Sequence, residues 1–223
     1  MSFSKKLKYF LVHELNISYK KAQALLESGA VKVDGNIVQE NALLSKNSEI
    51  KVEEVVIRPF KTFNYFLLNK PRGIECTLNP EIPDNLLRFI PDGMKLFPAG
   101  RLDKASEGLL FLTDDGELAW KIMHTGIEKE YVVRVDAEID EEFCERMRGG
   151  VKILGQTTKP CKVFQADETS FRIILTQGLN RQIRRMCHQC NREVKFLKRI
   201  RIDNFLLGEI APGEGNFIAI DKK

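Results

Sequence analysis

The chain has 223 residues, of which 43% are hydrophobic and 30% are charged. This composition is that of an ordinary globular protein, and it excludes wholesale disorder and collagen-like repetition. No window holds the roughly 18 to 20 consecutive apolar residues that a membrane span needs, and the first residues do not resemble a secretory signal, so we expect a cytoplasmic protein without membrane contact. The five cysteines are odd in number and irregularly spaced, which favours reduced thiols over a disulfide framework.

Positive charge is concentrated in one segment near the end of the chain. The net charge is only +4, but residues 178–201 contain eight Lys and Arg and one acid, so that segment carries 8 − 1 = +7 and the remainder −3. A basic segment on a slightly acidic protein is typical of contacts with a phosphate backbone. A solvated helix face followed by a basic strand would give the same count, so charge alone leaves both interpretations open.

The first 60 residues predict a compact unit of two helices and a few short strands. Apolar spacing predicts helices over 4–15 and 19–28, and Ser18 is placed to cap the second. Asp34-Gly35 lies between two alternating segments and predicts a hairpin over 30–38, with a further strand over 49–57. A unit this small has little core of its own, so we expect it to have a neighbour or an RNA partner.

These residues resemble the S4-like RNA-binding domain along its whole length. The resemblance is carried by Lys6-Leu7, by Asn16-Ile17-Ser18, and by the run from Leu25 to Gly35. It implies that the second helix and the hairpin grip structured RNA. The chain departs from the module at Tyr19, Gln23 and Ala24, where relatives are often Arg-rich, and a helical hairpin that only contacts protein is the alternative. The implied phosphate contacts are Lys5, Lys20, Lys21 and Lys32.

Arg58 to Lys61 reads as a linker, because Pro59 interrupts strand pairing. We therefore predict domains at 1–58 and 59–223. In the second, strands outnumber helices without a regular alternation, which predicts an α+β fold with a mainly antiparallel or mixed sheet flanked by helices. The expected strands cover 62–69, 74–77, 108–113, 130–135, 162–165, 171–176, 193–202 and 216–220, and the expected helices cover 85–90, 140–148 and 180–190, with another opened at 114–116.

Motifs for common cofactors are missing from the sequence. There is no Gly-rich phosphate loop followed by Lys-Ser/Thr, no strand-linked GxGxxG and no HExxH, so nucleotide hydrolysis, nicotinamide chemistry and zincin hydrolysis lack their parts. Cys187-His188-Gln189-Cys190 offers two or three ligands where structural zinc needs four. We expect neither a metal nor a cofactor.

The most distinctive stretch runs from Gly100 to Gly116. Asp103 lies between Arg101 and Lys104, ahead of an apolar segment. The cations favour the ionised carboxylate, whereas an apolar wall opposes it, which is one way in which catalytic acids are set up. A charged loop aspartate also caps turns, so the residues alone leave a structural role open.

This stretch resembles the catalytic motif of the pseudouridine synthases, and three further motifs of that family occur in order. They are Asn69 to Gly73, Lys129 to Val133, and Gly178 to Met186. With the S4-like unit in front, the chain is similar to the ribosomal enzymes of the RsuA, RluB, RluE and RluF group. The last motif leans toward the RluF-type branch, whose members act on 23S ribosomal RNA.

The resemblance implies a cofactor-free isomerisation of uridine to pseudouridine. The base must leave the sugar at N1, turn, and rejoin through C5 in a site that excludes water. Asp103 matches the catalytic aspartate, as nucleophile or as base at the sugar. Tyr131 matches the residue that stacks on the flipped uracil, and Arg184 matches the arginine that pairs with the aspartate.

Other residues are implied to contact RNA or to line the site. Arg101 would lie beside the extruded nucleotide, and Leu197 matches an apolar wall, with ordinary core packing as the alternative. The expected partner is 23S RNA, with 16S or transfer RNA as alternatives, and the default is a monomer. A non-catalytic RNA-binding assembly factor and an RNA glycosidase, which would release uracil, are alternatives from other classes. The remaining implied RNA-binding residues are Arg181, Arg185, Lys70 and Arg72, of which Lys70 and Arg72 are structural or phosphate-binding.

Overall fold

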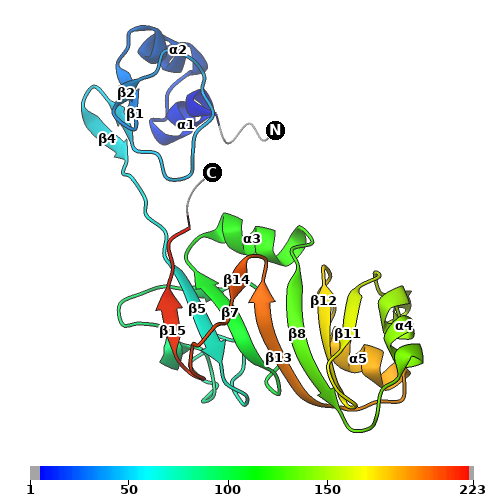
Figure 1. The fold of residues 1–223 in the computed structure, drawn as a ribbon. Helices are drawn as coiled ribbons and strands as arrows, with labels where there is room; N and C mark the ends of the chain where they lie inside the picture. The colour runs from blue at the N-terminus through cyan, green and yellow to red at the C-terminus, as the bar shows by residue number, and fades with distance from the viewer. Residues whose placement is uncertain (1–5, 221–223) are drawn as a thin grey trace. The chain divides into compact units, whose positions relative to one another are not determined.

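The computed structural model describes residues 6–220, and the chain divides into two compact units, Met1–Phe63 and Asn64–Lys223 (Figure 1). The division lies after the predicted linker, not within it at 58/59. Lys61 N–H donates to the Asn47 carbonyl over 3.1 Å, and the Asn47 amide donates back to the Lys61 carbonyl over 2.7 Å. These bonds attach residues 59–61 to the first unit. None of the helices within 6–220 is long and apolar enough to cross a membrane.

Residues 6–63 form two helices and a four-stranded antiparallel sheet in the order β2-β1-β3-β4. Ser18 accepts a bond from the Lys21 N–H at the start of the second helix, as predicted. Asp34 and Gly35 have φ of +50° and +83°, as the predicted hairpin requires. The single strand expected over 49–57 is instead two strands around Glu53 and Glu54. The elements are α1 (Leu7–Glu14), α2 (Tyr19–Glu27), β1 (Val31–Val33), β2 (Asn36–Ile37), β3 (Ile50–Val52) and β4 (Val55–Arg58).

Residues 64–220 form a nine-stranded sheet that is antiparallel except where β13 runs parallel to β7. The expected mixed sheet flanked by helices is confirmed (Figure 1). A strand expected over 74–77 is a loop instead. In spatial order the strands are β11 (Lys162–Gln165), β12 (Ser170–Leu175), β8 (Lys129–Val135), β13 (Val194–Ile202), β7 (Glu107–Thr113), β5 (Tyr65–Lys70) and β15 (Gly215–Phe217), while β6 (Phe97–Pro98) pairs with β7 and β14 (Phe205–Leu206) with β13.

Two helices of this unit, α3 and α4, start at capping aspartates, whereas α5 follows Arg181, whose side chain makes no capping hydrogen bond. Asp115 accepts bonds from the N–H groups of the first turn of α3, and Asp140 accepts one at the start of α4. A short hairpin lies beside α5, and a single 3-10 turn lies in the loop-rich stretch before β6. The elements are α3 (Gly116–His124), α4 (Glu141–Gly149), α5 (Gln182–Gln189), β9 (Lys152–Ile153), β10 (Gln156–Thr157) and the 3-10 turn η2 (Leu87–Phe89).

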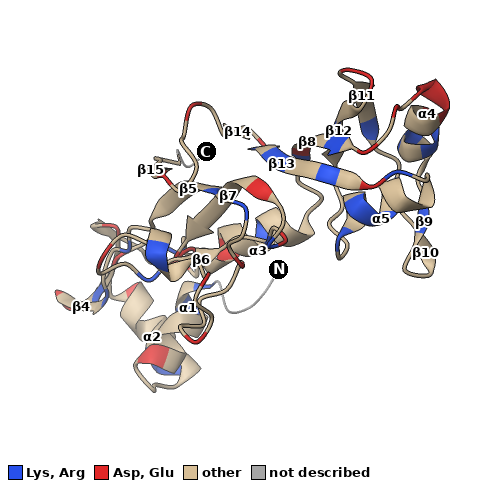
Figure 2. Ribbon diagram, turned by 90° about the horizontal axis from the view of Figure 1, so that it is seen from below, with Lys and Arg blue, Asp and Glu red and all other residues tan. Residues whose placement is uncertain are grey.

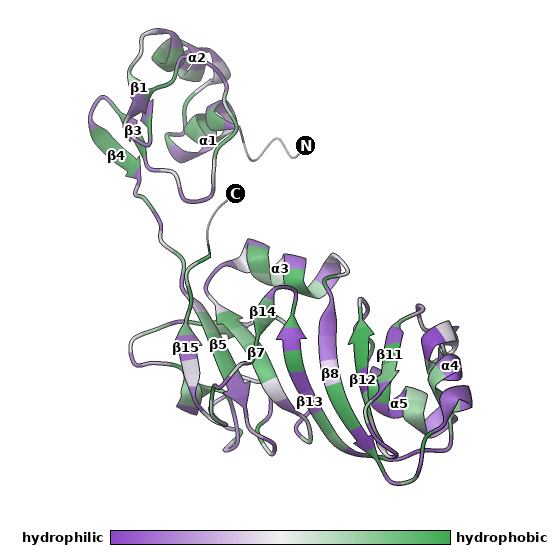
Figure 3. Ribbon diagram, in the orientation of Figure 1, coloured by the Kyte–Doolittle hydropathy of each residue, from purple (hydrophilic) through white to green (hydrophobic). Residues whose placement is uncertain are grey.

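Three apolar clusters cover the two faces of the sheet. On one face, α4 and α5 pack over β8, β11, β12 and β13, and the loops before β7 pack over β5 and β7. On the other face, α3 covers β5 and β7. Since β5 and β7 are covered on both faces, every residue of the two strands except Tyr65 and Glu107 is buried, and the central residues of each strand are apolar (Figure 3). Tyr131 packs against both clusters of the first face, so it marks the seam between them.

Gly108 allows β7 to lie close against β13, with which it pairs in parallel at Arg199. Its φ is +103°, and a Cβ built on it would lie 2.2 Å from the Arg199 carbonyl oxygen. This close approach of two backbones requires glycine. The glycine therefore lets β7 start directly after the loop that carries Asp103.

Candidate active site

The loop that carries Asp103 is fixed by its backbone. Gly73 N–H donates to the Lys104 carbonyl over 2.7 Å, and Ser106 N–H donates to the Asp103 carbonyl over 3.0 Å. Leu102 N–H points at the Cys76 sulfur, 3.3 Å away. The loop over 74–77, expected as a strand, thus helps to hold the loop that carries Asp103. The Asp103 side chain is 30% exposed and lies at the rim of a cavity.

Arg184 reaches from α5 to Asp103 and is held by fixed acceptors. It donates to the carbonyls of Val194 and Ala105 and to the Ser106 hydroxyl, each over 3.1 Å. Its Nε is buried with no hydrogen-bond partner among residues 6–220, and it lies 3.7 Å from the Asp103 carboxylate. The guanidinium therefore faces the carboxylate with its position set by other groups, as a residue that orients a catalytic acid requires.

The charge around Asp103 is mostly positive. Arg181 Nη1 lies 3.8 Å from the same carboxylate oxygen as Arg184. Burial lowers the pKa of Arg184, Arg181 lowers it further, and Asp103 opposes both. Since an arginine pKa lies far above neutrality, Arg184 stays charged. No hydrogen bond from residues 6–220 reaches the Asp103 carboxylate, so it is attracted by cations yet available for reaction.

A cavity of about 120 Å³ adjoins Asp103 and has an apolar wall. Tyr131 enters it from β8, where it faces Arg199 on β13, whose guanidinium lies 6.0 Å from the ring centroid. The ring thus lies between a buried cation and the cavity. Apolar walls beside an aromatic ring and a carboxylate can hold a flat base next to a reacting group. The other apolar lining residues are Leu102, Leu175, Leu179 and Ile183.

For Lys70 and Leu197 the structure supports the second role that the sequence left open, a structural role for Lys70 and core packing for Leu197. Lys70 is fully buried and donates to the carbonyls of Pro71 and Ile74, each over 2.8 Å, so it is structural and cannot touch RNA. Burial lowers the pKa of Lys70. Leu197 is 6% exposed within the cluster under α5 and does not line the cavity, because it pairs with Val133 deeper along the sheet.

The remaining implied contacts are exposed. Arg101 and Arg181 line the cavity, and Arg72 lies exposed on the turn after β5. Arg185 is exposed on α5. Basic residues lie along α5 and β13 (Figure 2).

In the first unit the implied RNA contacts differ among themselves. Lys20 and Lys21 are exposed on α2. Lys32 is engaged in an ion pair with Glu54, and the Lys32 hydrogen bond lowers the pKa of Glu54. Lys5 lies outside the described residues.

Sequence reasoning missed two polar groups that build the site. Ser106 is 1% exposed, and its hydroxyl accepts from Arg184. Gln182 is 4% exposed, and its side-chain oxygen accepts from the Leu179 N–H over 2.9 Å, which fixes the loop before α5. Their positions within the two motifs were the available signal, but neither residue type by itself marks a site.

The cysteines of α5 are packed in the core. Cys187 is fully buried and Cys190 is 5% exposed. Burial raises the pKa of Cys187 far above neutrality, so the thiol is not ionised. Within residues 6–220, no three His, Cys, Asp or Glu side chains gather to hold a metal ion.

A family model and several known proteins are similar to this chain. The model of the RNA pseudouridylate synthase family matches residues 64–189. The dual-specificity RNA pseudouridine synthase RluF of Escherichia coli is 43% identical over 209 residues, 92% of this chain and 72% of that protein. An uncharacterized RNA pseudouridine synthase of Aquifex aeolicus is 36% identical over 94% of this chain and 90% of that protein. A crystal structure of a pseudouridylate synthase superposes with a TM-score of 0.68 and 28% identity, covering 96% of both chains. The chain therefore belongs to the RNA pseudouridine synthase family, and the resemblance to its RluF-type members is confirmed.

Proposed function

We propose that this enzyme isomerises a uridine of 23S ribosomal RNA to pseudouridine, as a cytoplasmic monomer that needs no cofactor. The proposal is supported by the arrangement around Asp103: its carboxylate lies at a small cavity, Arg184 is 3.7 Å away, and Tyr131 forms part of the cavity wall. Arg184 is the positioning residue: its three hydrogen bonds to fixed acceptors hold it where it can orient the carboxylate and keep it ionised.

The proposed reaction needs one carboxylate at the sugar. The bond between N1 and the sugar carbon breaks, the uracil turns, and C5 bonds to the same sugar carbon. The hydrogen of C5 leaves to solvent while N1 ends with a hydrogen, so nothing is added or lost overall. Glycoside hydrolysis would need a second carboxylate to direct a water, and here the cavity's task is to retain the free base. Tyr131 stacks on that base.

The first unit is proposed to act as an S4-like RNA-binding domain, through the exposed Lys20 and Lys21. Structured RNA is recognised mainly by shape and by its phosphates, which suits exposed lysines on a small rigid unit. The name of the E. coli relative includes dual specificity. Transfer RNA and 16S RNA are therefore tested beside 23S RNA.

The test is release of tritium from C5-tritiated transcripts of 23S, 16S and transfer RNA, and from ribosomal assembly intermediates. The parent enzyme should release tritium from 23S RNA. Asp103→Asn should release none, while Asp92→Asn, which changes an exposed aspartate of another loop, should behave as the parent does. Turnover that survives in Asp103→Asn contradicts the assignment. Free uracil among the products would indicate a glycosidase instead.

A further inference from the structure

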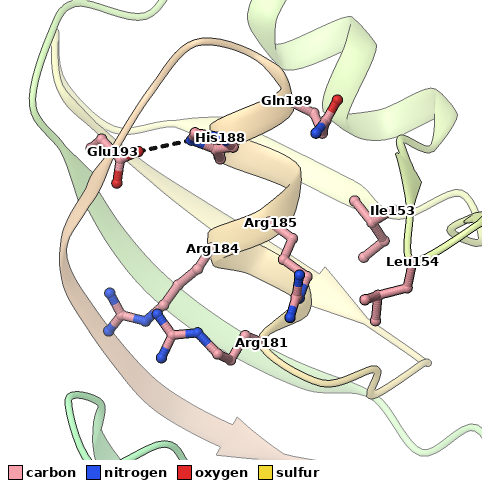
Figure 4. A pocket seen from close by; sticks show the side chains of 8 residues that line it. All are labelled: Ile153, Leu154, Arg181, Arg184, Arg185, His188, Gln189 and Glu193. Atoms are coloured by element: carbon pink, nitrogen blue, oxygen red, sulfur yellow. Dashed lines mark hydrogen bonds and ion pairs between the residues drawn. The ribbon is translucent and has the colours of Figure 1, made fainter.

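A second, larger cavity of about 280 Å³ lies against α5 (Figure 4). One wall is the tip of the β9–β10 hairpin, with Ile153 and Leu154, and the other is α5 with Arg185 and His188. Arg181 lines both this cavity and the one that holds Asp103. The two cavities are therefore neighbours, and we call this one the hairpin pocket.

The hairpin pocket carries more positive than negative charge. Arg181, Arg184 and Arg185 line it, against one acid, Glu193. That acid is already engaged, because His188 Nδ1 lies 2.8 Å from its carboxylate (Figure 4). Arg181 and Arg184 share the single Asp103 carboxylate. An anion that enters the pocket meets cations that the protein neutralises only in part.

Arg185 is oriented before any ligand arrives. Its Nε donates to the Asn180 carbonyl over 3.1 Å, and its Nη2 donates to the Asn180 side-chain oxygen over 3.3 Å. Its Nη1 has no partner within residues 6–220. A guanidinium held on one edge and open on the other is suited to phosphate, since less side-chain freedom is lost on binding.

The opposite wall presents an apolar side chain in an unusual backbone conformation. Leu154 has φ of +49° and Gly155 of +77°, between the paired residues Ile153 and Gln156, which is a two-residue type I′ turn. Such a turn favours Asn or Gly at the first position, and a bulky residue there is disfavoured. Leu154 is 52% exposed, so it gains little burial to offset this. Folding alone does not account for a leucine at this place.

We propose that the hairpin pocket holds one nucleotide of the RNA strand adjacent to the target uridine. Its phosphate lies between Arg181 and Arg185, and its base lies against Leu154. A phosphate ion alone would make no apolar contact with Leu154, whereas a nucleotide has both an anionic phosphate and a flat apolar base. RNA that enters the Asp103 cavity passes the neighbouring pocket, because Arg181 lines both. The inference rests on the proposed function.

The first test separates affinity from rate with two variants. Arg185→Gln removes the phosphate contact, and we expect the Kd for 23S RNA to rise about tenfold and the slope of log Kd against log salt to fall by about 0.7 to 0.9. Leu154→Asn places a residue that the turn prefers, so thermal stability should not fall, while the Kd should rise about threefold at an unchanged salt slope. The single-turnover rate at saturating RNA should stay within about twofold of the parent.

Matched controls exclude general effects of these substitutions. Arg172→Gln removes an exposed arginine from the opposite face of β12, whose residues Phe171 and Ile173 pack under α5. Leu206→Asn removes an exposed leucine on β14. Neither control should change the Kd.

The second test identifies the bound group in RNA whose target uridine has been mapped. With an abasic nucleotide next to the target, Leu154→Asn should no longer raise the Kd, because the base that contacts Leu154 is already missing. With a neutral methylphosphonate linkage there, Arg185→Gln should no longer raise the Kd, because the charge that contacts Arg185 is already missing. The inference is wrong if both variants bind RNA as tightly as the parent. It is also wrong if the variants still lose affinity when the RNA is modified at the nucleotide on either side of the target uridine. A parent enzyme without activity would contradict the proposed function instead.

Discussion

The two units present the cations to which we assign catalytic and RNA-binding roles in opposite ways. In the catalytic unit the Arg184 side chain is 14% exposed and donates to three fixed acceptors beside one carboxylate. In the first unit Lys20 and Lys21 are exposed on a helix surface. Chemistry at one atom requires a fixed geometry, whereas attraction of an RNA phosphate acts over several ångströms and tolerates mobile side chains. The difference predicts that changes in the two units separate rate from affinity.

The largest expected effect is on the framework of the catalytic loop. Gly108→Ala places a methyl group 2.2 Å from the Arg199 carbonyl oxygen at a φ of +103°. We expect the free energy of unfolding to fall by about 3 kcal/mol or more, as measured by urea denaturation. Gly116→Ala is the control: beyond its chain neighbours and the backbone of its own helix, none of the described atoms lies within 4 Å of the place that its new methyl group would take. The residue begins α3, so the variant's stability should equal or exceed the parent's. Equal stability of the two variants would contradict the conclusion that β7 and β13 can lie this close only with glycine at position 108.

The next effect is on the chemical step. Arg184→Lys keeps the charge but loses the planar group that reaches Val194, Ala105 and Ser106 together. A misplaced cation leaves Asp103 less well oriented, so single-turnover tritium release should slow by about 100-fold. The Kd for RNA should change by less than about twofold. If tritium release slows only because the Kd for RNA rises, and recovers at saturating RNA, Arg184 acts in RNA binding and does not position Asp103.

Much of the fold was predictable because apolar spacing reports burial directly. The helix that starts after Ser18, the Asp34-Gly35 hairpin and the buried strand over 107–113 all follow from residue types at short range. The segment 74–77 misled because Ile74 and Cys76 are buried at alternate positions, as in a strand, but in a loop that packs over β5 and β7. Alternation predicts which side chains are buried, not whether the backbone pairs.

The site was predictable only through the order of its motifs. Asp103 and Arg184 lie 81 positions apart, and no local pattern brings them together. For Lys70 the sequence left a structural role and a phosphate contact open, and its burial and its two hydrogen bonds to backbone carbonyls support the structural role. The Leu154 turn was missed because leucine is not a turn residue, and the backbone there opposes the residue's own preference.

A buried cation should also give the catalytic unit a pH response that the exposed lysines cannot. Lys129 is 9% exposed, and burial, then Arg199, lowers its pKa to about 8. In the folded state it loses its proton near pH 8, whereas the unfolded chain keeps it until about 10.5. Stability is therefore reduced below pH 8 and recovers as the pH rises from 8 toward 10.5.

Lys129→Met should remove that cost. At pH 7 the free energy of unfolding of the variant should exceed that of the parent by about 2 kcal/mol, and this difference should shrink as the pH rises toward 10.5. Urea denaturation at several pH values measures this. A constant difference across the range would show that packing, not charge, separates the two proteins.

The smallest effect is on affinity through the first unit, and Lys32 supplies the internal control. Lys20 and Lys21 together, changed to Gln, should raise the Kd for RNA by about tenfold and reduce the salt slope by roughly 1.5, with the saturating rate unchanged. Lys32→Gln should change the Kd less than a change of Lys20 or of Lys21 alone, because Glu54 already neutralises the Lys32 ammonium. Glu54→Gln should do the reverse and tighten binding, since it frees Lys32 for phosphate. If Lys32→Gln weakens binding as much as the double variant, the ion pair opens on RNA and the hairpin is part of the grip.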